Sequence, residues 1–430
     1  MMIRYKLFLI LMGLGYFAYA QTEPEYSQEY LEKSTSFAWL TLGGDLLTLT
    51  GGTTQQITNG ELEATPFGPT VQPRLTIGGF HFWGHADFYV TFPVGAVPLH
   101  NLPDTHPGVS YRQGVETGAR VYPWKVKPNS LRPFAGVSFR SISFRQNTPP
   151  NSFEFGGPNY AKMIAPLQVG LSYTTQKWSF TGSTYFQFQN EIDYFISPDQ
   201  MATIGLDPFS FQIGVVRYMD IDRNARTPSG VKSLNDRYRL LEDKGKLSDW
   251  YIGIGPSAAL QVSRSSFLQS QHPYLHDDYL SGIMADIAIG RYFYKPDMNI
   301  GLSYRGYSDV AEGFNTQVEI GRQSVMLEVY KFLFNYLGFV PFVGPTVSAE
   351  FLSTTVNGNT FSETKPAVGF IFGWDIRVAQ SERSLLRTNL RWVPNLHMDV
   401  EGEAVMFDHL EFNFIQWVFF PGRAAAFRNR

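Results

Sequence analysis

Cysteine is absent from all 430 residues of this chain. Its absence excludes disulfide bonds, thiolate metal sites, thiol nucleophiles and a lipidated N-terminal cysteine. The common catalytic and nucleotide-binding patterns are missing too, because the sequence has no G-x-S-x-G, no phosphate-cradling glycine loop and no H-E-x-x-H. The sequence therefore predicts a protein that is not an enzyme and carries no cofactor. One remote alternative stays open, a barrel-embedded hydrolase whose serine, histidine and polar partner meet at the barrel rim.

A dominant charge and a late apolar run are also missing. The chain holds 35 Lys and Arg against 38 Asp and Glu, for a formal net charge of −3, and nothing in this balance indicates a nucleic-acid partner. After the N-terminal region, no segment is apolar for the roughly 20 residues that a spanning helix needs. Any membrane-embedded part must therefore be a closed β-barrel, the other structure that satisfies every backbone polar group in lipid.

The N-terminus has the three parts of a removable export signal. Arg4 and Lys6 form the positive region, Leu7 to Phe17 the apolar stretch, and Ala18-Tyr19-Ala20 a small-residue cleavage site. The apolar stretch is well short of a membrane span, which disfavours an uncleaved anchor. We therefore expect residues 1–20 to be a signal peptide and residues 21–36 to be a periplasmic N-terminal leader.

Aromatic residues are abundant, and they fall on alternate positions. The chain has 36 Phe, 23 Tyr and 8 Trp, together 16% of its length. In the segment Trp178–Gln189, one alternate set is apolar and includes Phe180 and Phe186, whereas the other is polar and includes Ser183 and Gln187. Successive side chains of a strand point to opposite faces, so this segment has one apolar and one polar wall. A sheet that is apolar outside and hydrated inside is what a bilayer requires of β-structure.

The same alternation recurs along the chain and predicts an all-β fold, a transmembrane antiparallel β-barrel over residues 37–420. We expect about sixteen strands, with about 14 to 18 allowed, because single-chain bacterial barrels have an even number. The expected strands are Phe37–Thr48, Arg74–Trp83, His85–Phe92, Val115–Trp124, Arg132–Phe144, Met163–Thr174, Trp178–Gln189, Phe211–Met219, Trp250–Val262, Gly282–Tyr294, Met298–Tyr307, Ser324–Phe334, Phe339–Leu352, Ala367–Val378, Leu386–Val393 and Leu410–Phe420.

The connections between these strands alternate in length, which predicts short periplasmic turns and long extracellular loops. Short connections such as Thr175–Lys177 are followed by long ones such as Asn190–Ser210 that are rich in turn residues. Asp220–Asp249 breaks the rule, since it should be periplasmic yet is long and charged. Within it, Val231–Lys246 is expected to form a short helix with Leu234, Tyr238 and Leu241 on one side.

Charged residues within the expected strands fall on the polar, inward phase. A charge that faces lipid near mid-bilayer costs about 2–4 kcal/mol, so this sorting is meaningful. Arg291 is the main exception, on the outward phase near a strand end, where it can snorkel. We expect the inward set to line a pore in which the arginines favour anionic solutes; in the alternative, arginines and carboxylates pair and fill the lumen. The inward set is Glu116, Arg120, Arg140, Asp286, Arg305, Glu328, Glu350, Asp375, Arg377, Arg387 and Arg391.

Two histidine pairs have spacings that a metal site can use. His272 and His276 fall in an expected surface loop, which seldom supplies the fixed geometry that metal ligands need. His81 and His85 flank a tight turn, where packing at the membrane boundary is favoured over ligation. We therefore predict no metal site from these histidines.

One acidic segment begins like a calcium-binding loop. Asp220–Asn224 has the alternating acidic start, but Ala225 stands where that loop needs glycine and Val231 where it needs the bidentate glutamate. A solvated turn is the favoured interpretation of this segment.

With its export signal, alternating aromatic strands and unequal connections, the chain resembles bacterial (Gram-negative) outer-membrane β-barrel proteins of the porin-like kind. Gly118–Trp124 followed by Arg132–Gly136 looks like the hairpins common in such barrels. The last expected strand, Leu410–Phe420, is similar to the C-terminal strand that the barrel-assembly machinery recognises. The family usually ends on that aromatic, whereas here residues 421–430 continue as a basic C-terminal tail. The resemblance covers the mature chain, without a family-specific motif, and implies a place in the outer membrane.

Two functions remain open for such a barrel. The first is a porin-like conduit for small solutes. The second is a non-conducting barrel that acts as a structural or docking subunit of an outer-membrane or envelope complex. Its periplasmic contacts would come from Asp220–Asp249 and the basic tail, and its extracellular contacts from the aromatic-bearing loops Pro149–Tyr160 and Tyr194–Phe211. The expected partners are outer-membrane lipid, the barrel-assembly machinery during insertion and other envelope proteins.

Overall fold

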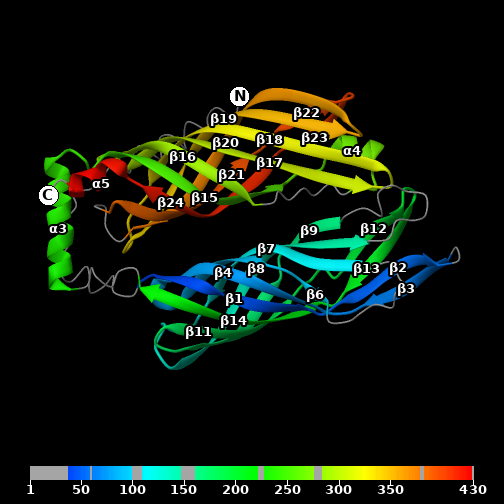
Figure 1. Cartoon of the computed structure of the whole chain (residues 1–430), viewed down its shortest axis with the longest axis horizontal. Coiled ribbons are helices and arrows are strands. Elements are labelled where there is room, and N and C mark those ends of the chain that lie inside the picture. Colours follow the sequence, from blue (N-terminus) through cyan, green and yellow to red (C-terminus); the bar gives the residue numbers. More distant parts are fainter. Residues whose placement is uncertain are drawn as a thin grey trace, which may run out of the picture.

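The computed structural model describes residues 37–58, 61–98, 109–146, 160–220, 227–275, 283–377 and 382–428. Within these ranges the chain forms two closed rings of antiparallel strands that lie side by side (Figure 1). In each ring, wall strands that are consecutive along the chain are neighbours in the wall, and the last of them pairs with the first.

Ring one is closed by β1, which pairs with β14 on one side and with β4 on the other. Its strands are β1 (Trp39–Leu49), β4 (Thr70–His81), β5 (Ala86–Pro93), β7 (Val109–Val121), β8 (Ser130–Gln146), β10 (Leu167–Thr174), β11 (Trp178–Phe186) and β14 (Phe209–Asp220).

Ring two is closed by β15, which pairs with β16 and with β24. Its strands are β15 (Asp249–Gln261), β16 (Met284–Phe293), β17 (Met298–Gly313), β18 (Thr316–Phe332), β19 (Phe339–Val356), β20 (Asn359–Ile376), β21 (Ser384–Val393) and β24 (His409–Phe419).

The expectation of a single barrel over residues 37–420 is wrong. Each segment predicted to be a strand overlaps one strand of the two rings, but β14 closes onto β1 instead of continuing the wall into β15. The physical reason is that alternation fixes which face of a strand is apolar and leaves open which strand it pairs with. The sequence signal for the break was Asp220–Asp249, the one connection that did not fit the alternation of short and long.

A helix forms within that connection and packs against ring two. Helix α3 (Pro228–Asp243) begins with Thr227 as N-cap, whose side chain accepts a hydrogen bond from the Gly230 amide, and with proline at its first position. Leu234 and Leu241 are buried, as the expected helix required. The segment after β24 is also helical, as α5 (Pro421–Arg428).

The basic tail is therefore not a free extension where the structure describes it. Arg423 in α5 is buried, and its Nη2 donates to the Leu247 carbonyl at 2.6 Å. The Arg423 backbone amide donates to the Asp249 carboxylate at 2.7 Å, and Lys244 Nζ donates to the Ala426 carbonyl at 3.0 Å. These bonds fasten α5 to the start of ring two and to the end of α3.

Both helices lie at one end of the molecule, which we call the helix end, and small hairpins lie at the opposite hairpin end (Figure 1). At the hairpin end of ring one, β2 (Gly52–Thr58), β3 (Glu61–Phe67), β12 (Glu191–Ser197) and β13 (Gln200–Leu206) form a four-stranded sheet, and β6 (Val97–Pro98) and β9 (Tyr160–Ile164) extend the wall. At the hairpin end of ring two lie α4 (Ser266–Gln271) and the hairpin of β22 (His397–Val400) and β23 (Glu403–Met406).

Two hairpin-end connections of ring two are tight turns, which corrects the expectation of uniformly long loops there. Phe314–Asn315 joins β17 to β18, and Asn357–Gly358 joins β19 to β20. All four residues have positive φ, as two-residue hairpin turns of the primed type require. The four strands therefore run on as a continuous wall where the sequence pattern had left gaps between strands.

Within each ring the helix-end connections are short, and one of them is the single-turn 3₁₀ helix η1 (Phe82–Gly84) between β4 and β5.

Two of the prolines inside strands coincide with irregular pairing. The β15–β24 pairing shifts register between Ile254 and Ser257, at Pro256, and the β18–β19 pairing lacks partners at Gly344 and Pro345. Proline cannot donate to a strand ladder, so bulges and missing pairs at these positions follow.

Candidate functional site

The interior of ring one contains a buried ion-pair cluster around Arg74. Its Nε contacts Asp45 Oδ1 at 2.5 Å, and its Nη1 contacts Glu116 Oε2 at 2.7 Å. The hydroxyls of Tyr89 and Tyr185 both donate to Glu116 Oε1 at 2.9 Å. The Glu116 carboxylate therefore meets three donors from three other strands, which fixes it in place.

Arg120 extends this cluster along the lumen of ring one. Its Nε donates to Gln168 Oε1 at 3.0 Å, and its Nη1 contacts Asp87 Oδ2 at 3.3 Å. The guanidinium lies 4.0 Å from the centre of the Tyr89 ring. Arg140 Nη2 donates to Ser210 Oγ at 3.0 Å. These side chains reach across the lumen of ring one from one strand to another, and they fill its middle.

Arg391 is the centre of a larger cluster in ring two. Its Nη1 contacts Asp286 Oδ2 at 2.6 Å, its Nε contacts Glu328 Oε1 at 2.8 Å, and Glu411 Oε1 is 3.4 Å from Nη1. Arg305 also pairs with Glu411 and lies 3.6 Å from Glu328. One arginine therefore faces three carboxylates, each from a different strand.

Two further arginines complete the charge network of ring two. Toward the hairpin end, Arg322 makes two bonds to Glu350, of 2.7 and 3.1 Å. Toward the helix end, Arg387 makes two bonds to Asp375, of 2.6 and 3.0 Å. Planar two-bond pairing of this kind is the strongest ion-pair geometry that proteins use.

The helix end of ring two is closed by Arg377. Its guanidinium lies 3.9 Å from the centre of the Phe332 ring and contacts Asp375 at 3.1 Å and Asp297 at 3.6 Å. Burial raises the pKa of the Asp297 carboxyl above its ordinary value, although the positive charge of Arg377 opposes that shift. Aromatic residues on neighbouring strands, including Tyr292 and Phe342, fill the space around this closure.

Inward-facing glycines make room for these large side chains. In ring two, a Cβ on Gly290 or Gly301 would meet the ring or hydroxyl of Tyr251 at 2.7 or 2.3 Å. In ring one, a Cβ on Gly118 would meet the Tyr89 hydroxyl at 2.6 Å. The lumen of an eight-stranded barrel is just wide enough for side chains to fill, and here glycine opposite tyrosine fills it without a clash.

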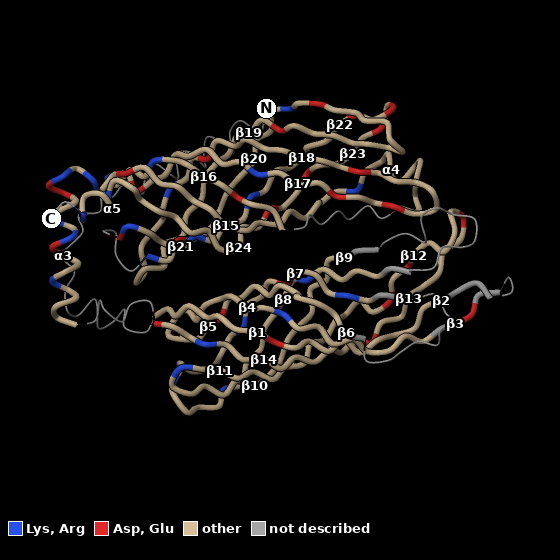
Figure 2. Tube along the Cα trace, in the orientation of Figure 1, with Lys and Arg blue, Asp and Glu red and all other residues tan. Residues whose placement is uncertain are grey.

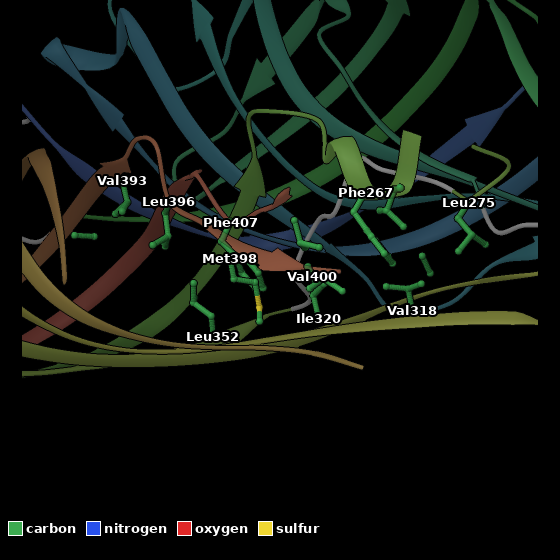
Figure 3. Packing of buried hydrophobic residues seen from close by; sticks show 14 of the residues in the cluster. Phe267, Leu275, Val318, Ile320, Leu352, Val393, Leu396, Met398, Val400 and Phe407 are labelled. Atoms are coloured by element: carbon green, nitrogen blue, oxygen red, sulfur yellow. The ribbon is translucent and has the colours of Figure 1, made fainter. Parts of the chain in front are cut away.

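The hairpin end of each ring is closed by an apolar cap. In ring one, Ile192, Tyr194 and Ile204 of the β12–β13 hairpin are buried together with Leu47 and Phe144 of the wall. In ring two, side chains of α4 and the β22–β23 hairpin pack on Val318, Ile320 and Leu352 (Figure 3). Both lumens therefore have the same order of layers: an apolar cap, a charged middle and an aromatic layer at the helix end.

All residues of the expected inward set do face inward and are buried. They do not share one lumen, however, because Glu116, Arg120 and Arg140 lie in ring one and the others lie in ring two. All of them except Arg140, which donates to Gln113 and Ser210, lie in ion pairs, the arrangement that the sequence left open as the alternative to a pore lining.

Sequence reasoning missed several members of the two clusters. These are Asp45, Arg74 and Asp87 in ring one, and Arg322 and Glu411 in ring two. Asp87 and Glu411 lie within expected strands on the inward phase, so the alternation rule could have found them. Arg322 lay outside the expected strand that began at Ser324, because the continuous wall across the tight turn was not foreseen.

The proposed extracellular contact loops are only partly available for contact. The segment Pro149–Tyr160 lies almost entirely outside the described residues. In Tyr194–Phe211, the Tyr194 side chain points into the cap, where its hydroxyl donates to the Gln55 carbonyl at 2.7 Å. An aromatic that closes the lumen cannot at the same time present itself to a partner.

The described histidines of the two pairs pack against aromatic rings or contact the backbone. His272 follows α4 and lies against the rings of Phe267 and Tyr274, and its expected companion His276 lies outside the described residues. His85 Nδ1 is 3.0 Å from the Tyr122 carbonyl oxygen. Among the described residues, no group of three or more metal-ligating side chains is found. Nor does any helix in the described part of the chain have the length and apolarity to cross a membrane.

The two rings meet along an aromatic interface. Phe37 and Tyr336 lie 5.7 Å apart at the helix end, Phe88 and Trp374 lie 5.8 Å apart further along, and Phe92 lies 5.8 Å from Phe414. In this interface one outward residue of β5 and one of β24 are buried: Val90 is only 8% exposed and Phe414 only 7%. Outward residues away from it, such as Leu75 (57%) and Phe372 (51%), are exposed.

A cavity of about 120 Å³ lies in this interface. Its walls come from β1, β4 and β5 of ring one and from β20, β21 and β24 of ring two. Leu40, Ile77, Phe88, Leu386 and Phe412 are among its apolar lining residues. His81 also lines it.

No protein-family model and no curated protein matches the chain. Solved structures do match, and they are outer-membrane β-barrel proteins. Neisserial surface protein A is 13% identical over 40% of this chain and 98% of its own, with a TM-score of 0.28. An outer-membrane channel from Pseudomonas putida F1 is 9% identical over 89% of this chain and 95% of its own, with a TM-score of 0.22. OmpT of Vibrio cholerae is 9% identical over 89% and 99%, with a TM-score of 0.15.

Proposed function

We propose that the protein is an integral outer-membrane protein whose two rings do not conduct solutes and which serves as a structural or docking subunit of the cell envelope. The observation that carries the proposal is the filled interior of both rings. In ring two, Arg391 holds Asp286, Glu328 and Glu411 across the lumen, and the apolar caps cover the hairpin ends.

A place in the membrane is supported by the outer faces of the rings. Large apolar residues stand exposed on alternate positions of both rings, among them Leu171, Phe180, Ile289 and Leu302. An exposed apolar outer surface on a barrel matches a bilayer, and a closed barrel leaves no unpaired strand edge in the lipid. Phe37, the first described residue, and α5 both lie at the helix end, and we place that end in the periplasm and the hairpins outside the cell.

The docking role is supported by a polar wall at the hairpin end of ring two. Strands β17 to β20 are 16 to 18 residues long, whereas about 9–11 residues cross a bilayer. On β18 the outward residues change from apolar Val325 to polar Gln323 and Glu319. We call the polar stretch of residues 306–323 and 353–366 the projecting wall; it carries an open hollow whose lining includes Glu319, Ser353 and Ser362.

The cap inside ring two backs this wall and keeps it rigid. Val318, Ile320 and Leu352 face inward from the projecting wall onto α4 and the β22–β23 hairpin, while the opposite face stays polar and exposed. A rigid, preformed surface loses little conformational freedom on binding, which favours recognition of a protein partner. At the helix end, α3 offers a second charged surface: Figure 2 shows basic and acidic residues along this helix, and Lys232, Arg239 and Glu242 are exposed.

Planar-bilayer recording tests the absence of conduction. The purified full-length protein is expected to give no discrete conductance steps, because ion pairs and apolar caps block both lumens. Reconstituted vesicles must float with lipid, to show insertion, and a porin inserted under the same conditions must give steps. Reproducible single-channel steps from this protein would overturn the non-conducting part of the proposal.

Site-specific photo-crosslinking in cells tests the docking role. A photoreactive residue in place of Ser362, in the hollow of the projecting wall, should give a discrete protein adduct. The matched control is the same residue in place of Leu302, which faces outward on β17 at the level of the apolar belt and should react with lipid only. Equal protein adducts at both positions, or none at Ser362, would argue against the projecting wall as a docking surface.

A further inference from the structure

The cavity between the rings has the properties of a binding site for an apolar group. Its volume of about 120 Å³ is close to that of an engineered apolar cavity of roughly 150 Å³ that stays dry and binds benzene. The lining is mostly aromatic and aliphatic side chains, such as Phe88, Leu386 and Phe412. A void of this kind leaves its lining atoms without packing partners on one side, and an apolar guest restores those contacts.

One polar group in the cavity wall lacks a partner. His81 lies on the outward phase of β4, yet it is only 7% exposed because Phe339 of ring two and Phe88 pack against it. Its Nδ1 is buried and meets no hydrogen-bond partner among the described residues. Leaving a buried polar atom unpaired is unfavourable, so His81 favours a guest that has a hydrogen-bonding group as well as an apolar part.

The position of the cavity indicates which kind of molecule can reach it. The cavity lies between the outward faces of the two rings, and away from the interface these faces expose apolar residues such as Leu75 and Phe372. From Phe88 to Phe92 the wall of β5 runs about 13 Å along the strand direction, and His81 stands at the helix end of β4 beside the turn at η1. A phospholipid matches this arrangement, because its apolar chain can lie along the barrel wall while its polar ester groups lie at the membrane boundary.

We propose that the cavity binds part of one acyl chain of a membrane phospholipid, with His81 Nδ1 donating a hydrogen bond to an ester carbonyl of that lipid. In lipid, apolar surfaces associate through close packing, since the bilayer is as apolar as the side chains themselves. A bound chain therefore completes the contact between the two rings where their own side chains leave a gap. The inference rests on the proposed membrane location and does not depend on whether the rings conduct.

Native mass spectrometry of the full-length protein tests the site. After detergent exchange that removes loosely held lipid, the wild type should retain one phospholipid. The variant Leu386→Trp fills the cavity from β21 and should retain at least ten-fold less. Leu302→Trp makes the same change on the exposed face of β17 and should retain as much as the wild type. Retention that is equal in both variants would contradict the proposal.

A second measurement uses the wild-type protein alone, so that it does not depend on a variant folding. Vesicles that contain phosphatidylethanolamine with a diazirine on its acyl chain should label β5 and β24 at the cavity several times more than β10 or β17. Even labelling around both rings would mean that only the general lipid belt was detected, and the site would be refuted. A His81→Phe protein, which keeps the ring but not the hydrogen bond, should retain the phospholipid several-fold less, and unchanged retention would refute the role of His81.

Failure of this test is distinguishable from failure of the proposed function. Conductance steps together with a retained lipid would overturn the non-conducting rings and leave the lipid site standing. Bilayer recordings without conductance steps, together with a protein that retains no lipid, would overturn the lipid site and leave the non-conducting rings standing.

Discussion

Replacing Arg391 with methionine is expected to lower the free energy of unfolding by about 3–5 kcal/mol, the usual effect of removing one partner from a buried ion pair. Arg391 is 1% exposed and faces Asp286, Glu328 and Glu411. Methionine approximates the length of the side chain but supplies no charge and no donor. Three carboxylates would then crowd one part of the lumen, with Arg305 the nearest remaining arginine to two of them.

Urea titration of the protein folded in detergent, followed by tryptophan fluorescence, measures this loss. The matched control is Arg291→Met on β16, the strand that also carries Asp286. Arg291 points outward and is exposed at the strand end, so its replacement should change the free energy of unfolding by less than about 0.5 kcal/mol. If the two variants were equally stable, Arg391 could not be the buried centre of a charge cluster.

Cleavage of the chain between the rings is expected to yield two independently folded barrels. A protease site inserted between Asp220 and Thr227 interrupts the connection between β14 and β15, which do not pair with each other. Each ring keeps all its strand pairs after the cut, because β1 pairs with β14 and β15 pairs with β24. In gels run without boiling, both fragments should therefore migrate as compact species that unfold only on heating.

A cut inside a ring provides the control. The same site inserted at the turn Asn357–Gly358 divides ring two between β19 and β20, which remain paired along their length. The two pieces should then run together as one folded species before boiling and separate only after it. If the cut between the rings gave only unfolded fragments, the wall would be a single barrel and the two-ring description would be wrong.

The strands and their faces could be predicted because the alternation of apolar and polar side chains is a local property. Trp178–Gln189 shows it without reference to any other segment, and burial of the inward set confirms the assigned faces. The closure of a barrel, in contrast, depends on which distant strand the last strand pairs with. The register of β14 against β1 pairs Tyr218 with Thr41, and nothing within either segment specifies that pairing over a pairing with β15.

The large size of the inward side chains is a sequence feature that indicates narrow barrels, and the prediction of one wide barrel did not take it into account. Arg74, Arg120 and Tyr185 point inward in ring one, and Arg391 and Tyr251 in ring two. Inward residues this large, set against inward glycines, indicate a lumen that is to be filled, whereas a wide lumen has no need of such matching. Read with the exceptional connection Asp220–Asp249, this pattern favours two eight-stranded barrels over one wide barrel.

The interface between the rings could not be predicted in the same way. Val90 and Phe414 are apolar outward residues like Leu171 or Phe372, and only the structure shows that the first two are buried. A lipid and a second barrel present the same apolar environment to a side chain, so the sequence pattern does not separate them. Like Arg291, His81 is a polar residue on the outward phase, and it lies where the rings meet.

The placement of β14 in the middle of the chain has a consequence for biogenesis. Ring one must be sealed by a strand that has no free terminus, since the polypeptide continues from Asp220 toward α3. Ring two alone is closed by a strand, β24, that follows all the other ring strands along the chain. Closing the two rings thus takes two separate pairings, β14 with β1 and β24 with β15, and the first of them joins two strands that both precede ring two in the sequence.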